Sequence, residues 1–165
     1  MGNITLSEVQ TQKIRIIILG PLPPPIGGME VMTQTLLTGL NKIENLSFRH
    51  INTQVSRSLA EKGGKHQIRK SWSGFIQAGK LVSLLISFRP DVVYLPLTNS
   101  PSFLGFLRDA LFIVPALLFK KKVVIRLNGG YYFYVHRTGL QQKVVRLILG
   151  KVSLALVVSQ ISYSK

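Results

Sequence analysis

The chain has 165 residues, of which 46% are hydrophobic, and it contains no cysteine. This length is typical of one compact domain, and the apolar content is too high for a disordered chain. The lack of cysteine excludes a disulfide, a thiolate zinc site and a cysteine nucleophile, and the three histidines are isolated from one another. We therefore expect neither a metal site nor a resident cofactor.

The charge is strongly positive, because 21 lysines and arginines face only 6 acidic residues, for a formal net charge of +15. Such a field favours an anionic partner. Nucleic acid, anionic lipid headgroups and phosphorylated small molecules all fit it, and net charge alone does not choose among them. The sequence carries no recognition helix, RRM or KH signature, so we expect no nucleic-acid partner.

No apolar run reaches the ~20 residues that a membrane-spanning helix needs. The longest candidate, 103–119, is interrupted by Arg108 and Asp109 and contains Pro115. Residues 1–12 lack the basic start and apolar block of a secretory signal. We expect a cytoplasmic protein, with the inner face of the membrane as a possible place of attachment.

The first half of the chain begins with a β-branched apolar run at 14–19, which predicts a buried parallel strand. A proline-rich turn and Gly27-Gly28 follow, and apolar residues at helical spacing then predict a helix up to residue 40. Residues 46–53 predict a second strand. Residues 54–73 are polar and basic, and we interpret them as a mobile loop.

The second half repeats the alternation of helix and strand. Helices are predicted at 75–88, 102–119 and 140–149, and strands at 92–95, 123–127 and 154–158, with the last strand expected to be buried. Parallel neighbours need crossover connections that cover the sheet. The pattern therefore predicts an α/β, Rossmann-like domain over residues 1–165, with an open, mostly parallel sheet and helices on both faces.

Ligands of such sheets bind beyond the carboxyl ends of the strands. The loops of interest are thus 20–30, 95–100, 128–134 and 159–165. Gly27 and Gly28 open a helix, where free N–H groups and the helix dipole favour an anion such as phosphate. The alternative is a tight turn that packs the helix on the strand. The loop matches neither the G-x-G-x-x-G dinucleotide motif nor the Walker P-loop.

Four segments resemble the N-terminal domain of family 4 glycosyltransferases of the GT-B fold. The run from Pro23 to Glu30 is similar to the family's proline-bearing turn and Gly-Gly-x-Glu helix start. The segments 89–94, 122–129 and 156–165 are similar to its later helix-to-strand junction, glycine-ended strand and closing segment. The resemblance implies the N-terminal half of a GT-B fold, which binds the acceptor, with the C-terminal nucleotide-sugar domain absent.

The resemblance also implies the site residues. Asn128 stands where the family usually has a histidine near the reaction centre; asparagine can hydrogen-bond there but cannot titrate near neutrality. His136 is a conceivable substitute, although a surface position is the simpler interpretation. The substrate-binding residues expected beside Asn128 are Gly27, Gly28, Glu30, Thr98, Asn99, Gly129 and Gly130.

A basic and aromatic stretch is expected to meet an anionic membrane surface, because enzymes of the resembled group often build lipid-linked glycans. A solvated flexible loop is the alternative. Its residues are Arg57, Lys62, Lys65, Arg69, Lys70 and Trp72.

The residues and the resemblance leave three functions to consider for this chain. The favoured one is the acceptor-binding half of a glycosyltransferase, inactive alone, which takes a sugar from a nucleotide-sugar held by a C-terminal half and passes it to a glycan or lipid-linked acceptor. The alternative is a non-catalytic, membrane-peripheral binding module of the same fold. A complete small-molecule enzyme needs an acid–base pair, and the six scattered acids do not supply one; Glu30 and Asp91 have structural explanations.

Overall fold

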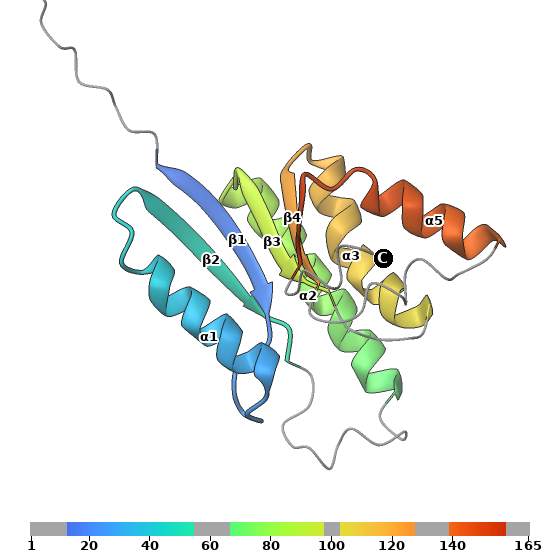
Figure 1. Cartoon of the computed structure of the whole chain (residues 1–165), viewed down its shortest axis with the longest axis horizontal. Helices are drawn as coiled ribbons and strands as arrows, with labels where there is room; N and C mark the ends of the chain where they lie inside the picture. Colours follow the sequence, from blue (N-terminus) through green and yellow to red (C-terminus); the bar gives the residue numbers. More distant parts are fainter. Residues whose placement is uncertain (1–12, 55–66, 98–102, 128–138, 158–165) are drawn as a thin grey trace, which may run out of the picture.

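The computed structural model describes residues 13–54, 67–97, 103–127 and 139–157, without the side chains of 67–72 and 104 (Figure 1). The strands are β1 (Ile14–Gly20), β2 (Leu46–Asn52), β3 (Val92–Pro96), β4 (Lys122–Leu127) and β5 (Leu154–Val157). The helices are α1 (Gly28–Leu40), α2 (Gln67–Ser87), α3 (Phe103–Leu118) and α5 (Gly139–Leu149).

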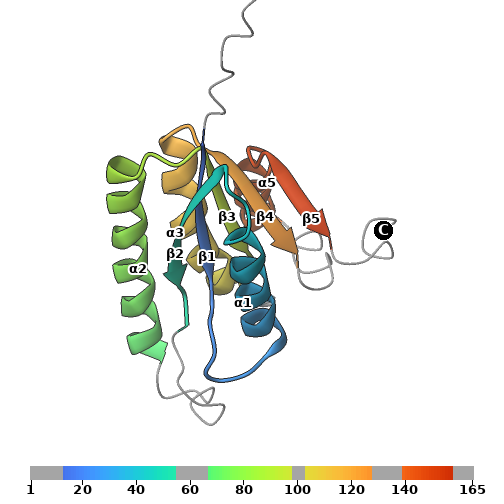
Figure 2. The same cartoon turned by 90° about the vertical axis from the view of Figure 1, so that its left-hand side faces the viewer.

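The strands form one sheet in the order β2-β1-β3-β4-β5, and every pair of neighbours is parallel. The connection from β1 to β2 steps to one side, and all later connections step to the other. Right-handed crossovers therefore place α1 on one face and α2, α3 and α5 on the opposite face. Figure 2 shows α1 and α2 on opposite sides of the sheet. The predicted α/β sheet with helices on both faces is confirmed.

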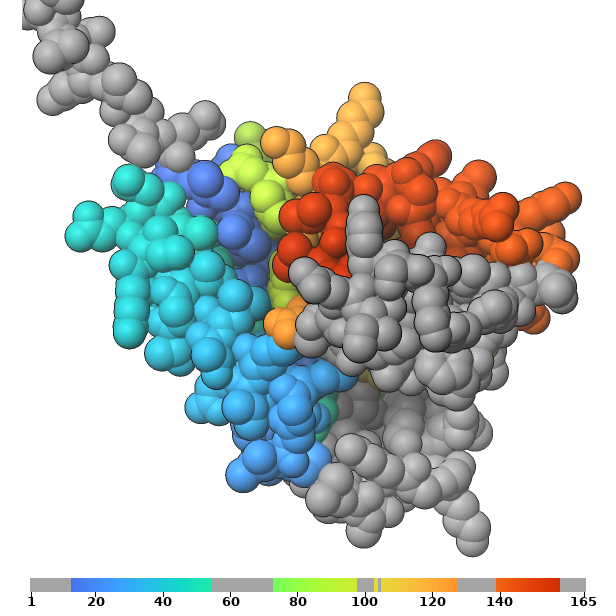
Figure 3. Space-filling view, in the orientation of Figure 1, coloured from blue at the N-terminus to red at the C-terminus, as the bar shows by residue number. Residues whose placement is uncertain are grey.

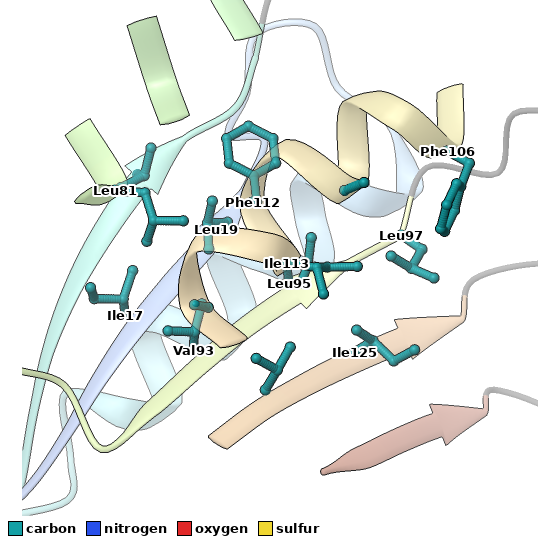
Figure 4. Packing of buried hydrophobic residues seen from close by; sticks show 14 of the residues in the cluster. Ile17, Leu19, Leu81, Val93, Leu95, Leu97, Phe106, Phe112, Ile113 and Ile125 are labelled. Carbon is teal, nitrogen blue, oxygen red and sulfur yellow. The ribbon is translucent and has the colours of Figure 1, made fainter. Parts of the chain in front are cut away.

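The main core lies between the sheet and α2, α3 and α5, and Figure 4 shows the part of it between the strands and α2 and α3. Alternate residues of the strands point into it because successive side chains of a strand face opposite sides. Its strand members include Ile17, Leu19, Val93, Leu95, Val123 and Ile125, and its helix members include Leu81, Leu85, Phe106, Ile113 and Val145.

Asp91 lies at the opposite end of the sheet from the expected site. Its Oδ2 accepts a hydrogen bond from Arg15 N at 2.8 Å, and its own N–H donates to Arg15 O, also at 2.8 Å. This pair fastens the start of β3 to β1. The structural explanation expected for Asp91 is thus confirmed.

The interpretation of 54–73 as a loop is wrong for its last seven residues, because α2 begins at Gln67. Polar and basic residues predominate in that stretch, so the apolar period by which a helix is detected is weak there. Ser73 and Gln77 of this helix are joined by a hydrogen bond of 3.3 Å between Gln77 Nε2 and Ser73 Oγ.

The expectation of a buried last strand is also wrong. All four residues of β5 are exposed, Leu154 at 52% and Leu156 at 42%. The reason is position: among the described strands β5 pairs with β4 alone and lies at one end of the strand order. An apolar run indicates a strand but does not indicate whether both of its faces are covered.

Candidate ligand-binding edge of the sheet

The strand order reverses direction between β1 and β3, since β1 is followed along the chain by β2 on one side and then by β3 on the other. In open parallel sheets the loops that follow two such strands diverge to opposite faces and leave a crevice between them. The loop after β1, residues 21–27, leads to α1. This carboxyl edge of the sheet is the candidate site.

The structure describes three of the expected substrate-binding residues, Gly27, Gly28 and Glu30, and places them together at the start of α1. The other five expected site residues lie outside the described ranges. All five follow, within three residues along the chain, strands that end at this same edge, since β3 ends at Pro96 and β4 at Leu127. They are Thr98, Asn99, Asn128, Gly129 and Gly130.

The two glycines differ in what surrounds them. Gly27 is the residue that precedes α1, and its carbonyl accepts a hydrogen bond from Val31 N at 3.0 Å. A Cβ at Gly27 would lie 2.5 Å from Glu30 Oε2, whereas a Cβ at Gly28 would meet nothing within 4 Å. The Glu30 carboxylate therefore folds back over Gly27, and the backbone at Gly28 is open to an approaching group.

Glu30 changes the electrostatics of this loop. Its carboxylate lies in the first turn of α1, where a negative charge interacts favourably with the positive end of the helix dipole. A phosphate approaching the same turn would meet this carboxylate and be repelled by it. The arrangement favours a ligand that donates hydrogen bonds, such as a hydroxyl compound, over an anion.

Two residues at the end of β2 hold the loop in place. Asn52 Oδ1 accepts hydrogen bonds from Leu22 N at 3.2 Å and from Gln54 N at 2.9 Å. Gln54 Nε2 lies 3.3 Å from Pro24 O and 3.4 Å from Glu30 Oε1, and donates to both. The position of the Glu30 carboxylate is thus set from the neighbouring strand.

Two further polar side chains converge on the end of β2 from the opposite face. Gln77 of α2 donates from Nε2 to Asn52 O at 3.3 Å, and Arg108 of α3 donates from Nη2 to Thr53 O at 3.3 Å. Gln77 is only 7% exposed. Within the part of the chain that the structure describes, Gln77 Oε1 and Arg108 Nε are buried and have no hydrogen-bond partner.

A buried donor or acceptor without a hydrogen-bond partner destabilises the folded state by about 1–3 kcal/mol. The two have complementary requirements, since Gln77 Oε1 needs a donor and Arg108 Nε needs an acceptor.

His50 of β2 lies beside β1 on the face that carries α1. Its Nε2–H donates to Gly20 O at 2.9 Å, and the same carbonyl accepts a hydrogen bond from Thr53 N at 3.2 Å. Burial lowers the pKa of His50 below its ordinary value, and the hydrogen bond to Gly20 opposes that shift. The neutral ring with its proton on Nε2 is the form that this arrangement holds.

The sequence pattern did not indicate Asn52, Gln54, Gln77 or Arg108 as site residues. A signal was available for the first two, because they are polar residues at the end of a predicted strand. For Gln77 and Arg108 the only local signal was a polar side chain within an apolar helix, and its partner lies more than 20 residues away.

The basic residues expected to meet a membrane are only partly described. Arg57, Lys62 and Lys65 lie outside the described ranges. Arg69, Lys70 and Trp72 belong to the first turns of α2, and their side chains are not described. Among the described helices, none is both long enough and apolar enough to span a bilayer. No three His, Asp or Glu side chains gather at a potential metal site in the same part of the chain.

Comparison with protein-family models and with curated proteins gives no match. Among solved structures, the chain is similar to the crystal structure of a UDP-N-acetylglucosamine 2-epimerase, with a TM-score of 0.54 and 12% sequence identity. The likeness shows a GT-B-type fold. It covers 91% of this chain and 43% of the epimerase chain, so this chain spans less than half of the length of the protein it resembles.

The comparison agrees with the fold class predicted from the sequence. A Rossmann-like sheet of GT-B type was expected, and it is confirmed. At 12% identity the likeness concerns the fold alone. Membership of glycosyltransferase family 4 therefore stays a hypothesis, and its support comes from the motifs and from the edge of the sheet described above.

Proposed function

We propose that this chain is the acceptor-binding half of a glycosyltransferase, which transfers a sugar from a nucleotide-sugar to a glycan or lipid-linked acceptor. The observation that carries the proposal is the start of α1. Gly27, Gly28 and Glu30 lie at the start of α1, beside the strand-order reversal of a GT-B-type sheet, and the backbone at Gly28 is unobstructed. A GT-B-type half offers such an edge to a second half, and the cleft between them holds the reactants.

The polar groups of this edge support an acceptor rather than a donor. A nucleotide-sugar is bound through its diphosphate, and the Glu30 carboxylate disfavours that group at the α1 N-terminus. Sugar hydroxyls donate and accept hydrogen bonds, and Glu30 provides acceptor oxygens beside an unobstructed Gly28. Binding and orientation of the acceptor are the roles proposed for Gly28 and Glu30.

Turnover is proposed to need a second half that holds the nucleotide-sugar. The reacting atoms meet only when two halves close on one another, and such positioning accounts for about 7–11 kcal/mol of barrier lowering in well-oriented reactions. Asn128 is proposed to lie near the reaction centre and to orient the donor sugar by hydrogen bonds. We expect Asn128→His to raise the rate of the completed enzyme or to leave it unchanged.

The decisive experiment measures release of nucleoside diphosphate from UDP-sugars and GDP-sugars. Residues 1–165 alone should release none, and addition of a nucleotide-sugar-binding GT-B half, fused or in trans, should start turnover. If the purified chain turned over by itself and lost activity on mutation of one of its own residues, a complete active site would lie within it and the proposal would be wrong.

Acceptor binding can be tested without turnover, by saturation-transfer NMR with a panel of oligosaccharides. Glu30→Gln and Gly28→Val should each weaken binding about tenfold or more, the first by altering the acceptor oxygens and the second by filling the open approach. Glu44→Gln, at an exposed turn, is the matched control and should bind as the wild type does. Equal loss with Glu44→Gln would show that charge alone governs binding.

The second candidate function is a non-catalytic module on an anionic membrane, which the net charge of +15 favours. Each lysine or arginine near such a surface contributes about 1 kcal/mol, screened by salt. The reversal of Lys62, Lys65, Arg69 and Lys70 to Glu should abolish sedimentation with phosphatidylserine vesicles. An equal change of charge elsewhere, at Lys13, Lys42, Lys143 and Lys151, should weaken it less. If both sets act alike, these residues do not form the membrane surface.

A further inference from the structure

Among the described helices, α1 alone covers its face of the sheet, and α2, α3 and α5 cover the other face. A helix is about 10 Å wide and neighbouring strands lie about 4.8 Å apart, so one helix covers roughly two strands. Among the described elements, α1 packs on β1. The β4 and β5 end of this face therefore has no helix over it in the described part of the chain.

The register shows which side chains lie on that uncovered area. Val123 and Ile125 point into the core under α3, so Val124 and Arg126 point to the α1 face. Leu154 pairs with Val124, and Leu156 pairs with Arg126, which places both leucines on the same face. Their exposed fractions are 52% and 42%. Figure 3 shows a hollow between α1 and β5, with parts of β1 and β3 at its floor.

We name this area the β4–β5 strip and define it as Val124, Leu154 and Leu156, flanked by Lys122 and Arg126. Lys122 and Arg126 lie on the same face as Val124, because alternate residues of β4 share a face. The strip therefore has an apolar middle, and the positive side chains of Lys122 and Arg126 lie along β4 on either side of Val124. A second copy of a chain with net charge +15 would be repelled from it.

We propose that the β4–β5 strip binds one amphipathic helix of a second polypeptide, with an apolar face for the strip and acidic side chains at its flanks. A helix is the element that packs on the face of a parallel sheet, and it would lie beside α1 as α3 lies beside α2 on the other face. The inference rests on the proposed function only for the identity of that polypeptide, which would be the half that binds the nucleotide-sugar.

The test uses a fluorescent peptide of about 18 residues, with leucines on one helical face and glutamates at its flanks. Binding to the whole chain is followed by fluorescence anisotropy. A peptide of the same composition in scrambled order keeps the charge and removes the apolar face. We expect the amphipathic peptide to bind at least about tenfold more tightly than the scrambled one.

The variants keep the net charge constant, so that a loss of binding reports on the strip itself. Leu154→Gln with Leu156→Gln should weaken peptide binding about tenfold, because both leucines lose apolar contact. Leu118→Gln with Leu147→Gln is the matched control, since these leucines are 75% and 67% exposed on helices of the other face. The control pair should leave binding unchanged. Thermal melts of both pairs verify that the fold is kept, and Leu156→Gln alone serves if the double variant is not folded.

Three results would overturn the proposal. Equal binding of the scrambled peptide would mean that charge alone attracts it. A wild-type dimer in sedimentation that the Leu154 and Leu156 variants dissociate would mean that a second copy covers the strip. Vesicle binding lost in the same variants would make the strip a membrane contact. Peptide binding without turnover after addition of the second half would refute the proposed function and leave this inference intact.

Discussion

His50 makes the stability of the fold depend on pH. Burial lowers its folded-state pKa below the ordinary value of 6.5, so the unfolded chain binds more protons between these two values. The neutral His50 ring is therefore fully compatible with the folded state above about pH 6.5. As the pH falls from there through the lowered folded-state pKa of His50, the free energy of unfolding decreases. Urea unfolding should show a smaller free energy of unfolding at about pH 5 than at about pH 7.5, and His50→Gln should reduce this difference. An unchanged difference in the variant would assign the effect to other groups.

Gly20 is a point of close approach between β1 and α1. A Cβ there would lie 2.7 Å from Thr33 Oγ1 and 2.9 Å from Thr33 Cγ2, and Thr33 is itself buried and bonded to Met29 O. Gly20→Ala should destabilise the chain by about 1–3 kcal/mol through overpacking. Adding Thr33→Ala should recover part of this loss, which a double-mutant cycle of urea unfolding measures. Gly39→Ala, in open space within α1, should instead stabilise by about 0.5–1 kcal/mol. A similar loss at both glycines would contradict the close-approach argument.

At the scale of elements, the loop between β1 and α1 is held by β2 rather than by its own residues. Asn52 supplies an acceptor to Leu22 N and Gln54 N. Asn52→Ala should cost about 1–2 kcal/mol and should speed hydrogen exchange at the Leu22 amide. Asn45→Ala, at an exposed turn before β2, should leave that amide unaffected. Slow exchange at Leu22 in the Asn52 variant would mean that the loop is held by other contacts.

At the scale of the whole molecule, the excess of positive charge opposes compaction. Like charges repel more strongly in the folded chain, and salt screens this repulsion. The Tm should therefore rise with sodium chloride, by about 2–4 °C for each kcal/mol of repulsion removed. Reversal of Lys13, Lys42, Lys143 and Lys151 to Glu lowers the net charge by about half and should flatten the salt dependence. A Tm that falls with salt would show that specific ion pairs outweigh the net repulsion.

The sequence by itself determined the fold class and the order of the strands and helices, although not the start of α2. Apolar runs such as 14–19 form strands, and the helical spacing after Gly28 forms α1, because the period of the apolar residues distinguishes a strand from a helix. Strands that alternate with helices lead to a parallel sheet of right-handed crossovers. The expectation that Gly27, Gly28 and Glu30 lie at its carboxyl edge follows from the same rule, since they come after the first strand.

Only the tertiary structure decided what depends on neighbours far apart in the sequence. The strand order made β5 an edge, so the same apolar pattern that is buried in β1 is exposed at Leu154 and Leu156. The packing of α2 and α3 against the end of β2 brought Gln77 and Arg108 to consecutive carbonyls of residues 52 and 53. Such contacts are set by the register of strands and by the packing of helices, and neither leaves a periodic signal in the chain.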